Sequence, residues 1–151
     1  MSFDTRDGTH GARQPGGRVM LWLNNLMMKR IRRSGRAMGF NALILTTVGR
    51  RSGAERQTPV GWFAGADGSY LIVASAAGAA RNPAWYHNLA AHPDRVHVDV
   101  RGQRHAVTAE ELHGTGRDEA WRQIIAAAPR FAQYQQKTDR ALPIIRLTRR
   151  T

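Results

Sequence analysis

Two apolar runs flank a glycine-bounded turn in the stretch FNALILTTVGRRSGAERQTPVGWF, residues 40–63. The pattern predicts two strands, at 40–48 and 55–63, because glycine gives the backbone the freedom that a tight turn needs. The bend would place three arginines together at one end of a sheet: Arg50, Arg51 and Arg56. Only Glu55 is close enough in sequence to neutralise them. The turn is therefore typical of a loop that binds an anion such as phosphate.

The rest of the chain alternates short periodic segments with glycine, proline and Asp-Gly turn signals. We expect further strands at 70–75, 96–100, 104–112 and 142–147. We expect helices at 18–35, 84–91, 117–128 and 131–138, with Asn82 and Pro83 as the cap and first turn of the second. Full βαβ alternation is absent, which argues against a doubly wound nucleotide fold. The predicted class is α+β (mainly β), a closed or split β-barrel of about six mostly antiparallel strands with peripheral helices.

Three parts follow one another along the chain. Residues 1–17 lack periodicity and are predicted to form a disordered tail. Residues 18–35 are predicted to form an amphipathic basic helix, and residues 36–151 the barrel domain. The apolar face of the helix consists of Val19, Trp22, Leu23, Leu26 and Met27. This face either packs on the barrel or makes peripheral membrane contact, with residues 18–36 lying on anionic headgroups.

Charge is the unusual feature of the composition. The 151 residues carry 23 Lys+Arg against 11 Asp+Glu, a formal net charge of +12, and all but two of the cationic residues are arginine. An anionic partner would explain this excess, although a GC-rich genome also favours arginine over lysine. No apolar run is long enough for a membrane span, and the basic cluster follows the first apolar patch instead of preceding it as in a secretory signal. We therefore expect a cytoplasmic protein.

Most catalytic signatures are missing from the sequence. Cysteine is absent, which removes thiol catalysis and cysteine-based metal sites. We find no P-loop, no GxGxxG, no GxSxG elbow and no histidine spacing of the HExxH type, so no metal is expected. Aromatic residues near the loops, Phe131 and Tyr134, suit a pocket for a planar ligand, whereas Trp85 suits core packing.

Several motifs together resemble one family, the deazaflavin (coenzyme F420)-dependent nitroreductases of actinobacteria. LILTTVGRRSG at 43–53 is similar to the family's LLLTTxGRKSG, and RQTP at 56–59 to its RxTP. VAS at 73–75 with Gly78, followed by NPAWYHNL at 82–89, is similar to VASxGGxxxxPxWYxNL. YQQKTDR at 134–140 with Pro143 is similar to YQxxTxRxIP. The match runs from about residue 40 to 148.

The resemblance implies a split β-barrel related to oxidases that bind flavin mononucleotide (FMN). It implies hydride transfer from reduced F420 to an electron-poor acceptor such as a quinone or nitroaromatic. The coenzyme's phosphate and acidic tail would bind at Arg50, Arg51, Ser52, Gly53 and Arg56. Its ring would lie beside Thr58, Pro59, Val60 and Gly61, with Ser75, Ala76, Ala77, Gly78, Ala84, Trp85 and Asn88 across the pocket. Ala128, Phe131 and Tyr134 would line the substrate pocket, with Tyr134 and Ser75 as the catalytic candidates.

Two departures from the family pattern bear on function. Ala76 replaces a lysine that family members often carry, which removes one interaction with the coenzyme's anionic part. The best-known nitroreductases have tyrosines at the positions of Ala128, Phe131 and Tyr134, and only Tyr134 is retained, so we expect slow reduction of nitro compounds. FMN in place of F420 and a basic nucleic-acid-binding barrel are the alternatives, the latter disfavoured because stacking aromatics are lacking among the basic strand residues. The protein would be a monomer or homodimer.

Overall fold

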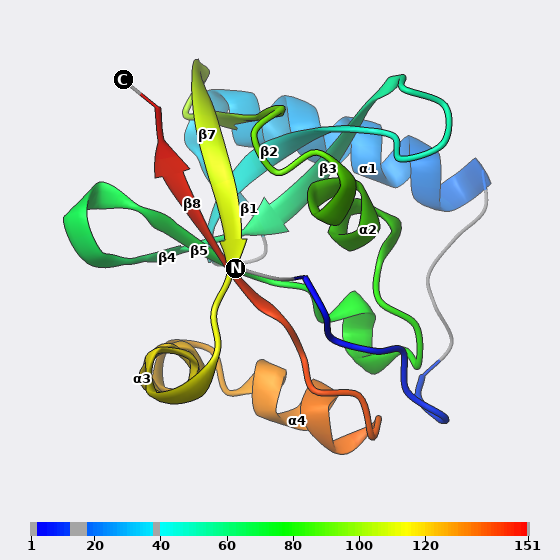
Figure 1. Ribbon diagram of the computed structural model, residues 1–151. Helices are drawn as coiled ribbons and strands as arrows, with labels where there is room; N and C mark the ends of the chain where they lie inside the picture. The colour runs from blue at the N-terminus through cyan, green and yellow to red at the C-terminus, as the bar shows by residue number, and fades with distance from the viewer. Residues whose placement is uncertain (1–2, 13–17, 38–39, 151) are drawn as a thin grey trace.

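The computed structural model describes residues 3–12, 18–37 and 40–150. Within them the chain runs from the long helix α1 through eight strands that alternate with three further helices and two 3-10 turns (Figure 1). The elements are α1 Arg18–Ser34, β1 Arg36–Ala37, β2 Phe40–Val48, β3 Glu55–Gly61, β4 Phe63–Ala64, η1 Ala66–Gly68, β5 Tyr70–Val73, η2 Ala76–Gly78, α2 Ala84–Ala91, β6 Val96–Val100, β7 Gln103–Glu111, α3 Gly114–Ala127, α4 Arg130–Gln136 and β8 Ile144–Arg149.

The strands form one curled sheet in which every described strand pair is antiparallel, as the tight turns predict. Their order is β1-β2-β6-β7-β8-β5-β4, with β3 paired to β2. The strand expected at 55–63 divides at Trp62, because β3 stays with β2 whereas β4 leaves it to pair with β5. Consequently β3 has one paired edge and one open edge, which leaves the barrel split.

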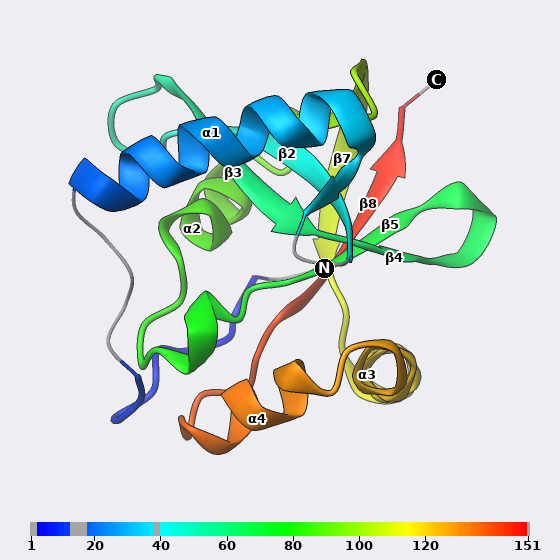
Figure 2. The same cartoon turned by 180° about the vertical axis from the view of Figure 1, so that it is seen from behind.

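Alternation along β2 explains how the layers pack. Leu43 and Leu45 point into the barrel, where they join the main hydrophobic core with α2. Ala42 and Ile44 point the other way and pack against α1, because successive strand residues face opposite sides of a sheet. The helices α3 and α4 cover another part of the sheet through a second cluster centred on β5 and β8. Figure 2 shows α1 lying across the strands on one side, with α3 and α4 at the opposite end.

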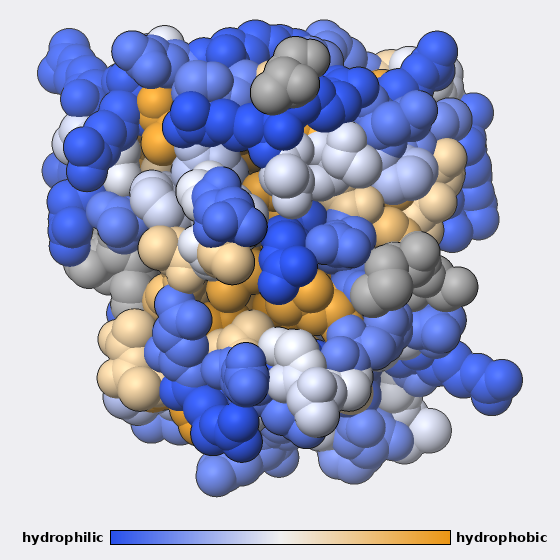
Figure 3. Space-filling view, turned by 60° about the vertical axis from the view of Figure 1, so that its left-hand side comes forward, coloured by the Kyte–Doolittle hydropathy of each residue, from blue (hydrophilic) through white to orange (hydrophobic). Residues whose placement is uncertain are grey.

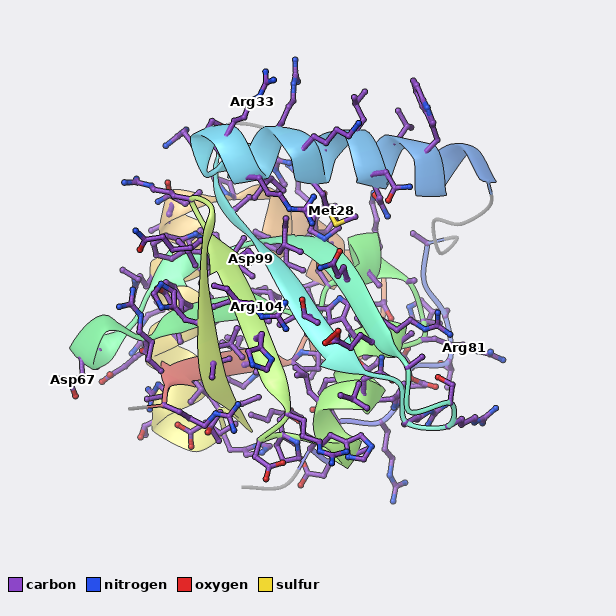
Figure 4. All side chains as sticks on the ribbon, turned by 90° about the horizontal axis from the view of Figure 1, so that it is seen from above. Met28, Arg33, Asp67, Arg81, Asp99 and Arg104 are labelled. Carbon is purple, nitrogen blue, oxygen red and sulfur yellow. The ribbon has the colours of Figure 1, made fainter. Side chains whose placement is uncertain are left out.

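The helix α1 occupies the range expected for it but buries a different face. Met28 and Ile31 are buried against β2. Trp22, Leu23 and Leu26 are instead 64%, 42% and 48% exposed. In Figure 4 Met28 points toward the sheet and Arg33 away from it. Of the two alternatives for the apolar face, packing on the barrel therefore does not hold for these three residues, whereas Met27 does pack beside Met28 and Ile31. The Val19 side chain lies outside the described residues.

The prediction of a disordered tail at 1–17 is wrong for residues 3–12. This segment makes a parallel bridge between Ala12 and Ala79, and Gly8 N donates to Ala80 O at 2.6 Å. The Phe3 ring packs edge-on against the Tyr86 ring. Tertiary hydrogen bonds order a segment whose local sequence has no periodicity. Residues 1–2 and 13–17 lie outside the described part of the chain.

The face shown in Figure 3 is mostly hydrophilic, and hydrophobic residues gather near its centre. No helix within the described residues is both long and apolar enough to cross a membrane.

Candidate functional site

The bend between β2 and β3 is closed by its own backbone. Gly49 N donates to Ala54 O at 2.8 Å, and Gly53 N donates to Gly49 O at 2.9 Å. Gly53 has a φ of 71°, a conformation that other residues adopt at a cost. Arg50 and Arg51 stand exposed on this bend. The glycines thus form a fixed turn that presents guanidinium groups to solvent.

One buried side chain of α2 holds the bend in place. The Asn88 Oδ1 atom accepts a hydrogen bond from Arg50 N at 3.1 Å, and its Nδ2 donates to Thr47 Oγ1 at 3.1 Å. Thr47 lies opposite Arg56 in the β2–β3 register, so their side chains share one face of the sheet. The structure therefore brings Arg50 and Arg56 to the same end of the β2–β3 pair, as the sequence predicts, and adds Asn88, which was expected across the pocket.

The strand β3 offers backbone groups along its open edge. Trp62 N donates to Asn41 O at 3.0 Å, so Trp62 is one of the residues whose backbone groups point toward β2. In an antiparallel pair every second residue points its backbone groups toward the partner strand and the residues between point theirs away. Gln57, Pro59 and Gly61 are therefore among those whose backbone groups point away from β2. Proline fits there because its missing N–H is not needed by the ladder. Thr58 and Val60 are half-buried and place their side chains on the face shared with Thr47.

Arg50, Arg51 and Arg56 have no carboxylate partner in the part of the chain that the structure describes. Among ion pairs of the described residues, none involves Arg50, Arg51 or Arg56. The sequence suggested Glu55 as their neutraliser, but its carboxylate lies 3.6 Å from Arg104. Beside the bend, burial and the positive charge of Arg50 lower the pKa of His87, so its imidazole is neutral at pH 7. The site is therefore an uncompensated cationic surface.

The loop at 74–82 follows β5 and contains η2. Ala76 has a φ of 45° and Gly78 a φ of 82°, so both lie in the left-handed region. A Cβ atom at Gly78 would lie 2.7 Å from Tyr134 O, which shows how closely α4 approaches this turn. Ser75 and Ala76 are half-buried, and the Ala77 side chain lies outside the described residues. Ala84 at the start of α2 is exposed, whereas Trp85 is buried in the main core.

The expected substrate-pocket residues lie on α4 and just before it. Phe131 and Tyr134 stack edge to face with ring centroids 5.7 Å apart, and Phe63 extends the cluster. Lys137 Nζ lies 5.8 Å from the centre of the Tyr134 ring. Ala128 is only 2% exposed, so its side chain is buried and does not line an open surface. The close approach of Tyr134 to Gly78 puts this tyrosine beside the 74–82 loop.

Two residues organise this loop in a way that the sequence does not predict. Asn82 was expected to cap α2, but Pro83 occupies the cap position and makes no side-chain cap bond. The Asn82 side chain instead donates to Thr5 O at 2.9 Å and accepts from Arg140 Nη1 at 2.7 Å. Arg140 is 2% exposed. The sequence marked Arg140 only as the last residue of the motif at 134–140. Nothing in the local sequence predicts that this arginine is buried, because arginine is mostly exposed in proteins.

A second polar cluster joins the first residues to the end of β7. Ligand-type atoms of Asp4, Glu111 and His113 lie within 4.8 Å of one another. Both Glu111 oxygens already accept hydrogen bonds, one from Thr5 Oγ1 and one from the Tyr86 hydroxyl. Burial and Glu111 raise the pKa of Tyr86, so its hydroxyl stays a donor. This cluster therefore works as a hydrogen-bonded anchor for the N-terminal segment.

Comparison with known proteins identifies relatives over most of the chain. The family model described as F420H(2)-dependent quinone reductase matches residues 23–149. The F420H(2)-dependent quinone reductase Rv1261c of Mycobacterium tuberculosis is 41% identical over 113 residues, 72% of this chain and 74% of that protein.

Two solved structures are similar in fold as well as in sequence. The F420-H2 dependent reductase FDR-A is 36% identical at a TM-score of 0.63 and covers 70% of this chain and 92% of its own. A structure described as a domain-swapped dimer is 31% identical at a TM-score of 0.64. The alignment covers 86% of this chain and 99% of that structure's chain. The split-barrel prediction is confirmed by the first of these matches.

Proposed function

Because this chain belongs to the F420H(2)-dependent quinone reductase family, we propose that the β2–β3 bend and the open edge of β3 hold reduced F420 while a quinone accepts its hydride. The protein is an oxidoreductase, and coenzyme F420 is its cofactor. When bound, the reduced coenzyme supplies the hydride, and the protein supplies binding and orientation. The FMN and nucleic-acid alternatives find no support among the relatives.

One observation carries the proposed binding mode: Arg50, Arg51 and Arg56 make no ion pair with a carboxylate among the described residues. Their donors remain available, and guanidinium forks suit phosphate and carboxylate oxygens. The coenzyme carries a phosphodiester and a polyglutamate tail, so its charge and the charge of the bend are complementary. Ser52 and Gly53 complete the bend, with Ser52 Oγ already accepting from Ala54 N at 3.2 Å.

The ring would lie along β3. The open-edge backbone of Pro59 and Gly61 can bond the polar edge of a deazaflavin, while Thr58 and Val60 contact its face. The 74–82 loop with Ala84 would close the opposite side, and Trp85 would support it from the core. Tyr134, whose backbone approaches this loop at Gly78, would be the candidate proton donor to the acceptor, with Ser75 as the second.

The exposed face of α1 supports peripheral contact with an anionic membrane. Trp22, Leu23 and Leu26 are exposed large hydrophobic residues. Lys29, Arg30 and Arg33 are exposed on the same helix. Apolar and cationic side chains on one helix suit the boundary between acyl chains and anionic headgroups, where a quinone dissolves. A second copy of this chain is the other occupant to test, since a similar structure is described as a domain-swapped dimer.

Binding and turnover test the proposed function together. We expect the purified protein to bind F420 and, with reduced F420, to reduce a soluble quinone. Arg51→Ala should weaken binding more for coenzymes with longer glutamate tails. A protein that purifies with FMN and ignores F420 would contradict the proposal.

Vesicles test the membrane contact. We expect sedimentation with anionic vesicles and not with zwitterionic ones, and no sedimentation of the double variant Trp22→Ser/Leu26→Ser. If this variant still binds the vesicles as well as the wild type does, the proposed membrane contact is contradicted. If the wild type instead dimerises as its concentration rises, and the variant does not, the exposed face of α1 binds a second copy of the chain.

The missing phenols give a separate expectation. Phe131 and Ala128 carry no hydroxyl, so nitro compounds should be reduced slowly compared with quinones. Rapid turnover of a nitroimidazole with reduced F420 would contradict this.

A further inference from the structure

Arg140 binds four acceptors, all of which belong to the 74–82 loop. Its Nη1 donates to Ala74 O at 2.8 Å and to Asn82 Oδ1 at 2.7 Å. Its Nη2 donates to Ser75 O at 2.8 Å and its Nε to Ala79 O at 3.1 Å. A guanidinium can make this many bonds at once because its donors lie in a fixed planar fork.

These bonds fix the direction of the neighbouring amide groups. The chain has no cis peptide among the described residues, and in a trans peptide the C=O and the following N–H point in opposite directions. Since Arg140 draws in the carbonyls of Ala74 and Ser75, the N–H groups of Ser75 and Ala76 point away from it. The Ser75 backbone is right-handed helical, with φ −80° and ψ −35°, and Ala76 is left-handed at φ 45°. This succession turns adjacent N–H groups toward a common point, where an anion can bind.

The guanidinium also places a buried charge behind these amides. Arg140 is 2% exposed and makes no ion pair among the described residues. Burial lowers the pKa of Arg140, and the charge of Asp7 opposes this shift by electrostatic attraction. A cation without a carboxylate partner favours negative charge on the far side of the loop.

We propose that Arg140 is a positioning residue that aims the Ser75 and Ala76 amides at the anionic, phosphate-bearing part of the coenzyme, an inference that rests on the proposed F420 function. The amide pair offers donors at the position where family members often carry a lysine and this chain has Ala76. Arg140 itself does not touch the coenzyme.

The test compares two ligands, one of which lacks the anionic part of the other. Dissociation constants are measured for F420 and for the deazaflavin nucleoside without the phosphodiester and tail. Arg140→Lys keeps the cation but removes the planar fork. It should weaken F420 binding by about tenfold or more and leave the nucleoside within about twofold. Arg117→Lys is the matched control, because Arg117 Nη2 also donates to a backbone carbonyl, Leu142 O at 2.8 Å, from α3. This control should change neither constant.

A second variant tests the amide donors directly, and can be used if Arg140→Lys does not fold. Ser75→Pro deletes one of the two amide donors, and a φ of −80° suits the proline ring. It should lower F420 affinity in preference to nucleoside affinity, and more than Ser75→Ala, which removes only the hydroxyl.

Equal losses for the two ligands in Arg140→Lys, or no loss, would overturn the inference while the proposed function stands. Failure of the wild type to bind F420 would overturn both.

Discussion

The bend at 49–53 and the loop at 74–82 both depend on arginine, but they use it in opposite ways. At the bend Arg50 and Arg51 are exposed, and no carboxylate among the described residues pairs with them. At the loop Arg140 is buried, and three of its nitrogens bond to backbone or amide oxygens. The first group has donors left for a ligand, whereas the second uses its donors to hold the fold.

This contrast shows how arginines can be assigned in a very basic chain. Net charge alone treats all the arginines of this sequence alike. Burial and partners separate them, because a buried guanidinium that already donates four hydrogen bonds to its own chain is not accessible to an anion from solvent. The separation predicts that mutations at the loop change stability first and mutations at the bend change affinity first.

The largest effect is expected at the buried arginine. Arg140→Leu removes the bonds to all four acceptors and leaves three of them without a donor among the described residues, whereas Ser75 O keeps the bond from Gly78 N. It should lower the free energy of unfolding by about 3–5 kcal/mol. Urea unfolding followed by circular dichroism measures this. Arg51→Leu, at an exposed position, is the control and should change stability by less than about 0.5 kcal/mol. Similar losses in the two variants would remove the distinction between the loop and the bend.

The next effect concerns affinity at the bend. Arg56→Ala removes one charge-assisted contact and should weaken F420 binding by about 10- to 100-fold, with stability nearly unchanged. Fluorescence titration measures the dissociation constant, and the loss should shrink at high salt because screening weakens charge–charge attraction. Arg104→Ala, whose guanidinium pairs with Glu55, is the matched control. An equal loss in this control would show that only net charge matters.

A smaller effect is expected where α2 holds the bend. Asn88→Ala removes the bonds to Arg50 N and Thr47 Oγ1, and should cost about 1–2 kcal/mol of stability together with a several-fold loss of F420 affinity. Asn88→Asp keeps the acceptor for Arg50 N but removes the donor to Thr47. It should therefore retain more affinity than Asn88→Ala. The opposite order would contradict the role of Asn88 in holding the bend.

The smallest effect is a pH dependence at His87. Burial, Arg50 and Asp7 act on this group, and the first two lower its pKa below the ordinary 6.5. Below pH 6.5 the unfolded chain therefore takes up a proton that the folded chain does not, so His87 makes stability fall as the pH drops. Between about pH 7 and 5.5 the wild type should lose slightly more stability than His87→Phe in urea unfolding. Parallel curves for the two proteins would contradict the lowered pKa. The pKa of Asp139, lowered to about 2 by hydrogen bonds from Thr9, keeps that group from titrating in this window.

Much of the fold follows from local pattern. Alternation predicted β2 and β6 over their observed residues, and the flanking signals predicted α2 at Ala84–Ala91. The antiparallel pairing followed from the short turns. Local pattern failed where tertiary contacts decide. Residues 3–12 are ordered by Glu111, Asn82 and Asp139, which lie far away in sequence. On α1 Met28 and Ile31 pack with Ala42 and Ile44 of β2, and Trp22, nine residues before Ile31 on a helix with about 3.6 residues per turn, falls on the opposite side.

The candidate site divides in the same way. The arginine-bearing bend is visible in the sequence because glycines and cations are contiguous there. The partner of Glu55 and the acceptors of Arg140 depend on which strands and loops meet, so they could not be predicted. The roles of the individual coenzyme-binding residues stay predictions, as does the part played by Tyr134.

The decisive experiment is a crystal structure of the protein in complex with F420. We expect the phosphodiester between the Arg50–Arg56 bend and the amides of Ser75 and Ala76, with the ring along the open edge of β3. A coenzyme bound elsewhere, for example against α3, with these arginines still in solvent, would contradict the proposed binding mode.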